Sequence, residues 1–109
     1  MSNFDVPMHK VSILFLKDVD EYIDTLPAMD QAKFDTAILA LREREYDEVQ
    51  IKKLRGSIHE LKLRKHRFIF FELESCIYFT NAFMKKTMKT PKLEIEYALA
   101  VYNKISNQL

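Results

Sequence analysis

The chain has 109 residues, of which 48% are hydrophobic and 30% are charged, and its formal net charge is +1. No apolar run approaches the roughly 18 residues of a membrane span, and the segment MSNFDVPMHK lacks the basic-then-apolar order of a signal peptide. The single cysteine, Cys76, excludes an internal disulfide, so we expect one globular domain over residues 1–109 in a reduced, cytoplasmic setting.

The N-terminal half predicts one strand followed by two helices. Residues 9–16, HKVSILFL, are β-branched and aromatic enough for a strand. Apolar side chains then recur at the helical spacing behind Asp18, which suits an N-cap, and this helix should end near Pro27. The spacing returns in an Ala-, Glu- and Arg-rich run, which predicts a second helix over residues 29–45.

The C-terminal half predicts three strands and a last helix. SIHELKL, RFIFFEL and CIYFTNAF, which cover residues 57–63, 67–73 and 76–83, indicate an antiparallel meander with tight connections. Thr90 can cap the last helix and Pro91 suits its first position. The order β-α-α-β-β-β-α predicts an α+β domain in which helices pack on one face of a small antiparallel sheet.

Strand alternation separates the side chains of SIHELKL. Leu61 and Leu63 should face the helices together with His59, for which a buried, hydrogen-bonded histidine is the simplest interpretation. Glu60 and Lys62 should then lie on the open face of the sheet. A ligand would bind on that face.

Charge is distributed unevenly along the chain. Residues 1–51 carry a net charge of −6, residues 52–92 carry +8 and residues 93–109 carry −1. Such segregation indicates a basic surface that meets a polyanion, unless folding mixes the two halves into a neutral surface. The RNA-binding candidates in the basic segment are Lys53, Arg55, Arg64, Lys65, Lys86 and Lys89.

The segment FMKKTMKTP, residues 83–91, joins the last strand to the last helix. Its lysines and the free N–H groups at the start of the helix suit a phosphate. The alternative is a solvated basic turn, because lysine on a surface connection usually lies in water.

Several short motifs in residues 50–105 resemble one protein family. They are Leu54, the run Glu60-Leu61-Lys62, Arg67, the segment FMKKTMKTP, and Glu94-Ile95-Glu96-x-Ala98. The pattern resembles the HigB-like branch of the RelE/ParE toxin superfamily, which includes phage-derived host-inhibition proteins. The chain differs from the usual pattern at Lys62, where the family usually has Arg, and at Asn81, where it often has His.

The resemblance implies a RelE-like fold and a type II toxin: a ribosome-dependent mRNA endoribonuclease that blocks translation and is silenced by a helix-turn-helix antitoxin. Lys62 and Arg67, followed by Lys85, are then the expected phosphate and transition-state contacts. Glu60 is either the general base or a partner that orients Lys62 through a salt bridge.

The sequence leaves alternatives open for the role of His66 and for the function of the protein. His66, in the basic link between two predicted strands, could reach the open face as an acid or base. No His or Cys pair has metal-site spacing, so we expect neither metal nor cofactor, and no membrane partner. Because Lys lacks the fork of Arg and Asn cannot shuttle protons as His does, a non-catalytic RNA- or ribosome-binding module is the main alternative. Inhibition of a host protein through the acidic N-terminal helices is another.

Overall fold

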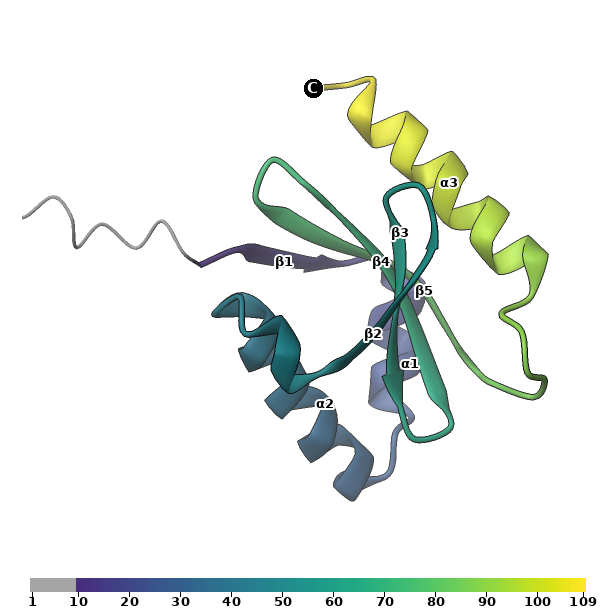
Figure 1. Cartoon of the computed structure of the whole chain (residues 1–109). Coiled ribbons are helices and arrows are strands. Elements are labelled where there is room, and N and C mark those ends of the chain that lie inside the picture. Colours follow the sequence, from purple (N-terminus) through teal and green to yellow (C-terminus); the bar gives the residue numbers. More distant parts are fainter. Residues whose placement is uncertain (1–9) are drawn as a thin grey trace, which may run out of the picture.

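The computed structural model describes residues 10–109 and confirms the α+β class. Within these residues a single five-stranded sheet is combined with three α-helices and one short 3-10 helix, η2 (Figure 1). The elements in chain order are β1 Ser12–Phe15, α1 Lys17–Asp24, α2 Ala28–Arg42, η2 Tyr46–Glu48, β2 Gln50–Arg55, β3 Ile58–Leu63, β4 His66–Leu73, β5 Cys76–Met84 and α3 Lys92–Ser106.

The sheet is mixed, with the strand order β1-β5-β4-β3-β2. Strands β2 to β5 form the antiparallel meander, whereas β1 pairs in parallel with β5 along its whole length. The prediction of an all-antiparallel sheet is therefore wrong for β1. Apolar residues in a strand do not encode the direction of its partner, which here is reached only after two helices and three further strands. Of the predicted strand over residues 9–16, His9 lies outside the described residues.

Strand β2 was not predicted. It is an edge strand, and three of its six residues, QIKKLR, are basic. A bulge between Lys53 and Arg55 interrupts its register with β3, so its apolar residues do not keep the period of two that marks a strand. Lysines on an edge strand also discourage pairing with a further chain.

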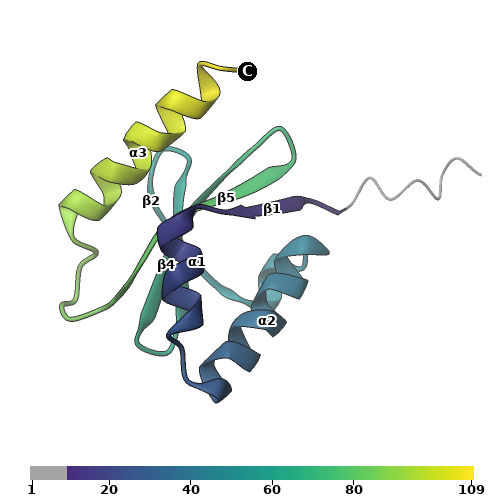
Figure 2. The same ribbon diagram turned by 180° about the vertical axis from the view of Figure 1, so that it is seen from behind.

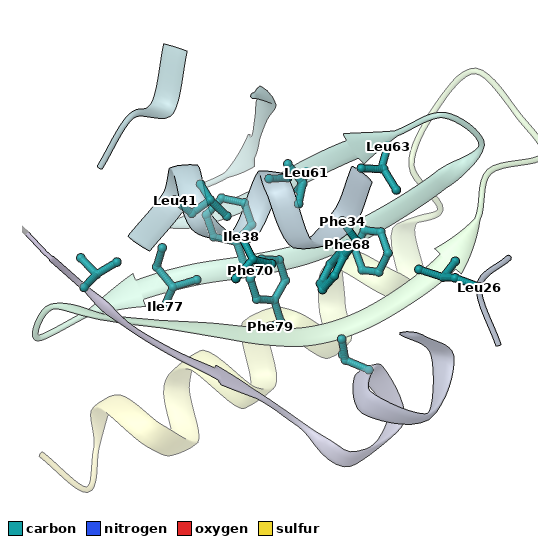
Figure 3. Close-up of a cluster of buried hydrophobic side chains, with 13 residues drawn as sticks. Leu26, Phe34, Ile38, Leu41, Leu61, Leu63, Phe68, Phe70, Ile77 and Phe79 are labelled. Carbon is teal, nitrogen blue, oxygen red and sulfur yellow. The ribbon is translucent and has the colours of Figure 1, made fainter. Parts of the chain in front are cut away.

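The larger core lies between the sheet and helices α1 and α2. Its centre is aromatic: the ring centroids of Phe34 and Phe68 lie 4.7 Å apart, and those of Phe70 and Phe79 lie 5.2 Å apart (Figure 3). Its buried members are Val11, Val19, Leu26, Phe34, Ala37, Ile38, Leu41, Leu61, Leu63, Phe68, Phe70, Ile77 and Phe79. Leu61 and Leu63 thus face the helices as predicted.

Helix α3 packs on the opposite face of the sheet, so the prediction that all helices share one face is wrong (Figure 2). There Ala98 of α3 joins Ile58, Ile69 and Phe71 in a second, smaller buried cluster. Strand β4 has apolar side chains on both of its faces, with Phe68 on one face and Ile69 on the other. A run that is apolar on both sides requires cover on both sides.

Two predicted helix caps are also wrong. Helix α1 begins at Lys17 with Leu16 in the cap position. Asp18 therefore lies in the first turn, where its negative charge interacts favourably with the positive end of the helix dipole. Helix α3 begins at Lys92 with Pro91 in the cap position. The Thr90 hydroxyl does not cap this helix but donates a hydrogen bond to the Glu60 carboxylate. Within residues 10–109, no helix is long and apolar enough to cross a membrane.

Candidate phosphate-binding pocket

Four of the five predicted catalytic residues line one pocket. It has a volume of about 470 Å³ and lies over β2, β3 and β4 at the start of the loop that follows β5. Register explains the convergence, since Lys62 pairs with Arg67 and Lys52 pairs with Glu60 across neighbouring strands. Paired residues project from the same face of a sheet. The lining residues are Val49, Gln50, Ile51, Lys52, Glu60, Lys62, Arg67 and Lys85.

Arg67 is the most constrained cation of this pocket. Its side chain is 8% exposed, and its Nη1 donates to the carbonyl oxygens of Arg64 at 2.8 Å and His66 at 2.9 Å. Its Nε lies 3.6 Å from Glu60 Oε2 and, among the described residues, has no hydrogen-bond partner. A guanidinium held in this way presents N–H donors in a fixed plane, which suits an anion with charge on several oxygens.

Glu60 is paired with Arg67, and the expected Glu60–Lys62 salt bridge is not formed. Glu60 is 2% exposed and accepts a hydrogen bond from the Thr90 hydroxyl. Arg67 lies diagonally across the β3–β4 pair from Glu60, a spacing that long side chains span, whereas Lys62 extends into solvent from the same strand. The carboxylate therefore orients Arg67 from one side.

Hydrogen bonds to the β3–β4 turn and to β3 hold the loop after β5 at its two ends. At its start, the Lys85 backbone N–H donates to the Lys65 carbonyl at 2.7 Å, and at its end Thr90 is bonded to Glu60. Lys85 is half-buried against the pocket, while Lys86 and Lys89 are exposed. The segment FMKKTMKTP thus borders the pocket through Lys85 and Thr90 and carries its other lysines outward.

Asn81, at the position where the resembling family often has His, ties β5 to helix α3. It is 8% exposed, and its Nδ2 donates to Glu94 Oε1 at 2.6 Å and to the Glu94 carbonyl at 3.2 Å. Its Oδ1 accepts a hydrogen bond from the Thr80 hydroxyl. Because these contacts occupy both amide atoms, the structure assigns Asn81 a structural contact rather than a place in the pocket.

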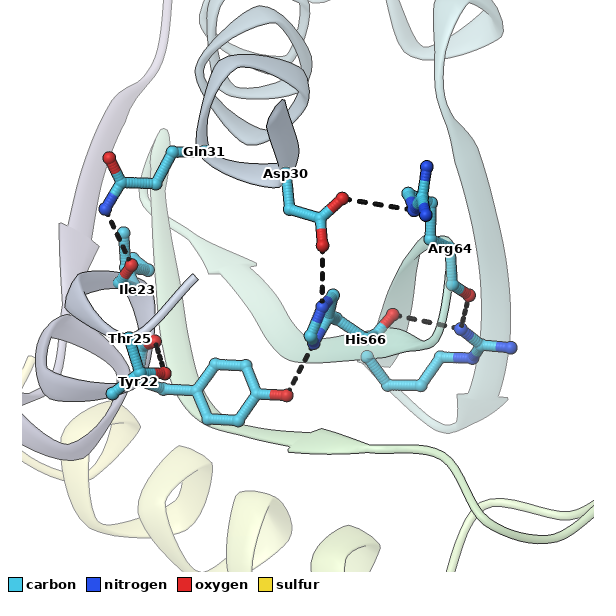
Figure 4. Close-up of polar contacts among 8 residues, drawn as sticks. Tyr22, Ile23, Thr25, Asp30, Gln31, Arg64 and His66 are labelled. Carbon is cyan, nitrogen blue, oxygen red and sulfur yellow. Dashed lines mark hydrogen bonds and ion pairs between the residues drawn. The ribbon is translucent and has the colours of Figure 1, made fainter. Parts of the chain in front are cut away.

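His66 lies on the other face of the sheet from the pocket, among α1, α2 and the β3–β4 turn. Its Nδ1 lies 2.6 Å from the Tyr22 hydroxyl and its Nε2 lies 3.2 Å from Asp30 Oδ2 (Figure 4). Strand β4 begins at His66, one residue before the predicted start, so alternation turns His66 and Arg67 to opposite faces. The expectation that His66 reaches the open face is therefore not met. Burial, and then the Asp30 charge, raises the pKa of Tyr22.

His59 shares the α1/α2 face as predicted but is only half-buried. Its ring stacks on Phe70 with centroids 5.6 Å apart, and its Nδ1 lies 2.9 Å from the Ser57 carbonyl oxygen.

The predicted RNA-binding residues form two groups. Arg64 and Lys65 occupy the β3–β4 turn, which the Lys85 backbone contacts, so this turn and the loop with Lys86 and Lys89 lie together beside the pocket. Lys53 and Arg55 are exposed on edge strand β2, where Lys53 pairs with His59 and so projects from the face opposite the pocket. The structure does not bring these two residues to the site.

Two residues at the pocket, Lys52 and Thr90, were not predicted as site residues from the sequence. Lys52 shares a face with Glu60, but that relation can be inferred only once β2 and its register are known. Thr90 was interpreted as a helix cap, although a threonine directly before Pro91 can equally donate to a nearby carboxylate.

A model of a protein family described as phage-derived protein Gp49-like matches residues 21–103. Among curated proteins, no sequence matches the chain.

Solved structures of toxins with low sequence identity share the fold. A free-state mutant of the E. coli toxin RelE gives a TM-score of 0.62 at 12% identity, covering 84% of this chain and 96% of that one. A chain of the RelE-RelB complex from Pyrococcus horikoshii gives 0.59 at 16% identity, covering 69% and 94%. A chain of the toxin-antitoxin complex RelBE2 from Mycobacterium tuberculosis gives 0.56 at 14%, covering 70% and 99%.

Proposed function

The chain belongs to the Gp49-like family of phage-derived proteins and has the fold of RelE toxins, and from this we propose that it is a toxin that cleaves mRNA on the ribosome. The observation that supports this most is the pocket in which the backbone-held guanidinium of Arg67 lies with three lysines. Four cations around one small pocket suit a phosphodiester of a nucleic acid.

The proposed chemistry is attack of a ribose 2′-oxygen on the adjacent phosphorus, with breakage of the bond to the 5′-oxygen. Arg67 stabilises the charge that grows on the phosphate oxygens, and Lys62 and Lys85 contact the phosphate from the exposed side. The proton of the 2′-hydroxyl passes to a base, for which Glu60 is the carboxylate that lines the pocket. The leaving 5′-oxygen takes a proton from a neighbouring lysine ammonium or from water.

The same proposal assigns the remaining basic residues and the partners. Arg64, Lys65, Lys86 and Lys89 contact the RNA backbone beside the pocket, and Lys53 and Arg55 provide further positive charge along β2. An antitoxin silences the protein, in line with the RelE-RelB and RelBE2 complexes of its structural relatives. The activity is cytoplasmic and needs no metal.

Induction in a bacterium, followed by mapping of mRNA ends, tests the function. We expect growth arrest with new 5′ ends inside codons for the wild type. Arg67→Ala should lower the single-turnover rate on programmed ribosomes by about 10²–10³-fold, because one preorganised donor is lost. Arg67→Lys should recover little, and Lys62→Arg should keep or raise the rate, since it supplies a second fork. A folded Arg67→Ala protein that cleaves at the wild-type rate would refute the role of Arg67.

A non-catalytic ribosome-binding module is the second candidate. It is favoured by the histidines, since neither His59 nor His66 lines the pocket and Asn81 is engaged with Glu94. Growth arrest without new mRNA ends would support this candidate over the nuclease.

A further inference from the structure

We propose that Asp30, on helix α2, is a positioning residue for Arg67, and that it acts through the β3–β4 turn on the other side of the sheet. The inference rests on the proposed role of Arg67 as the main phosphate contact. It assigns His66 to the same positioning network and not to proton transfer.

The first step is the way in which Arg67 is held. Its Nη1 donates to two backbone carbonyls, those of Arg64 and His66, at 2.8 and 2.9 Å. Both acceptors belong to the β3–β4 turn and the start of β4. The direction of the guanidinium is therefore set by the conformation of this short backbone segment.

The second step is that the side chains of these two residues converge on a single carboxylate. Asp30 Oδ1 lies 3.1 Å from Arg64 Nε, and Asp30 Oδ2 lies 3.2 Å from His66 Nε2 (Figure 4). The Asp30 side chain is 11% exposed and that of His66 is 9% exposed, so the contact between them is shielded from solvent, whereas the Arg64 side chain is 55% exposed. One carboxylate thus holds both residues whose carbonyls hold Arg67.

The third step is that the turn needs such support. Arg64 has a φ of 56°, the left-handed region that residues with a side chain seldom adopt. A conformation of this kind persists when surrounding contacts fix it. Asp30 supplies the contact on the Arg64 side, and the Tyr22 hydroxyl, 2.6 Å from His66 Nδ1, completes the support from helix α1.

Alternation along β4 makes this arrangement possible. His66 projects toward α1 and α2 while Arg67 projects into the pocket, yet the His66 carbonyl accepts from Arg67. The chain thus uses the rigid helix layer on one face to fix a cation on the other face, and the network needs no side chain to pass through the sheet.

NMR of the Arg67 side chain tests the inference without any requirement for activity. In the wild type we expect a sharp Nε–Hε signal with slow hydrogen exchange, because this group is buried. Asp30→Asn should shift and broaden that signal, and should speed its exchange at least tenfold. The matched control is Asp35→Asn, at an exposed aspartate of the same helix, which should leave the signal in place.

Kinetics test the link to function. On programmed ribosomes, Asp30→Asn should lower the cleavage rate at saturation at least tenfold while ribosome affinity changes less than twofold. His66→Asn, which keeps a side-chain polar group but cannot transfer protons near neutral pH, should fall between Asp30→Asn and the wild type. Arg64→Met keeps α2 intact and removes one contact of Asp30, so it replaces Asp30→Asn in the NMR measurement where that protein does not fold. It is not used for the kinetics, because Arg64 is itself a proposed RNA contact.

The outcomes separate the two proposals. An unchanged Arg67 signal in folded Asp30→Asn, or in Arg64→Met in its place, overturns the positioning role whether or not the protein cleaves RNA. A shifted signal together with a wild type that cleaves no mRNA supports the positioning role and refutes the proposed function. A His66→Asn rate as low as that of Arg67→Ala, with the Arg67 signal unchanged, would return His66 to the chemistry.

Discussion

The two faces of the sheet are built from the same strands, yet they bury apolar and polar side chains in different proportions. Among residues 10–109, the core cluster on the face toward α1 and α2 holds thirteen buried hydrophobic residues, with aromatic rings at the centre. In the same described part of the chain, the cluster toward α3 holds four, and beside them the charged pair of Glu60 and Arg67 is buried as well. The α1/α2 face also buries one polar contact, between Asp30 and His66 beside the β3–β4 turn, but apolar burial dominates there. On the α3 face the Glu60–Arg67 pair lies beside a much smaller apolar cluster, and such buried charges must be paired.

This difference indicates a division between stability and function. The apolar residues of β3 and β4 that face α1 and α2 contribute to packing, and their neighbours in sequence face the pocket or α3, whereas His66 belongs to the polar network with Asp30. A change at one residue should therefore affect mainly the free energy of unfolding, while a change one position away should affect mainly phosphate contact. Each of the following variants tests that separation.

Phe68→Ala should have the largest effect on stability. Phe68 is fully buried and contacts the rings of Phe34, Tyr22 and Phe79. Truncation of a buried phenylalanine lowers the free energy of unfolding by about 3–5 kcal/mol, since transfer energy is lost and a cavity remains. Urea denaturation measures this change.

Phe71→Ala is the matched variant on the other face. Phe71 is also fully buried, and its ring meets Tyr78 and Tyr102. We expect a smaller loss than for Phe68→Ala, because fewer rings surround the cavity and α3 covers it from one side. An equal or larger loss would show that the α3 face contributes as much stability as the α1/α2 face.

Arg67→Met should have the next largest effect, because it leaves Glu60 buried without its charge partner. Loss of one partner of a buried ion pair costs about 3 kcal/mol or more. The double variant Glu60→Leu, Arg67→Met removes both charges, and its stability should return to within about 1 kcal/mol of the wild type or exceed it. Neither protein should cleave mRNA. A double variant as unstable as Arg67→Met would mean that the pair contributes to stability as well as to the pocket.

Much of this fold was accessible from the sequence because the apolar spacing was regular. The three helices, the three hairpin strands and the placement of Glu60 and Lys62 on one face follow from periods of 3.6 and 2. Strand β2 was missed because a bulge and three basic residues break that period. The direction of β1 and the side of α3 depend on pairing between distant segments, which a local pattern does not contain.

The site shows the same limit at the scale of single residues. The convergence of Lys62, Arg67 and Lys85 agrees with the motif, since each position follows from strand order and alternation. His66 was predicted to lie in a link from which it could reach the open face. Because β4 already begins at His66, strand alternation turns its side chain away from the face of Arg67. Thr90 was assigned to a cap, since its distance from Glu60 arises only when the loop after β5 folds back.

Thr90→Val should have a moderate effect that is confined to the α3 face. The variant keeps the shape of the side chain but removes the hydroxyl that donates to the buried Glu60 carboxylate. A hydrogen bond to a charged group contributes about 1.5–3 kcal/mol, and amide hydrogen exchange in residues 85–90 should become faster. Thr87→Val is the control, because Thr87 is exposed and bonds only within the loop, to the Lys89 carbonyl. Equal exchange rates in the two variants would show that the Thr90–Glu60 hydrogen bond does not hold the loop in place.

Tyr22→Phe should have the smallest effect on the free energy of unfolding, and this effect should be seen mainly at alkaline pH. Burial, and then the negative charge of Asp30, raises the pKa of Tyr22 above its ordinary value of 10.0. The fold therefore favours the protonated phenol, so this contribution to stability is fully present below about pH 10 and is lost as pH rises through the higher folded-state pKa. The free energy of unfolding should fall less steeply from about pH 9 to pH 11 in Tyr22→Phe than in the wild type. Tyr97→Phe, at an exposed tyrosine of α3, should keep the wild-type slope. If both variants kept that slope, neither burial nor the Asp30 charge would raise the pKa of Tyr22, which would contradict the contact of its hydroxyl with His66, the residue that also contacts Asp30.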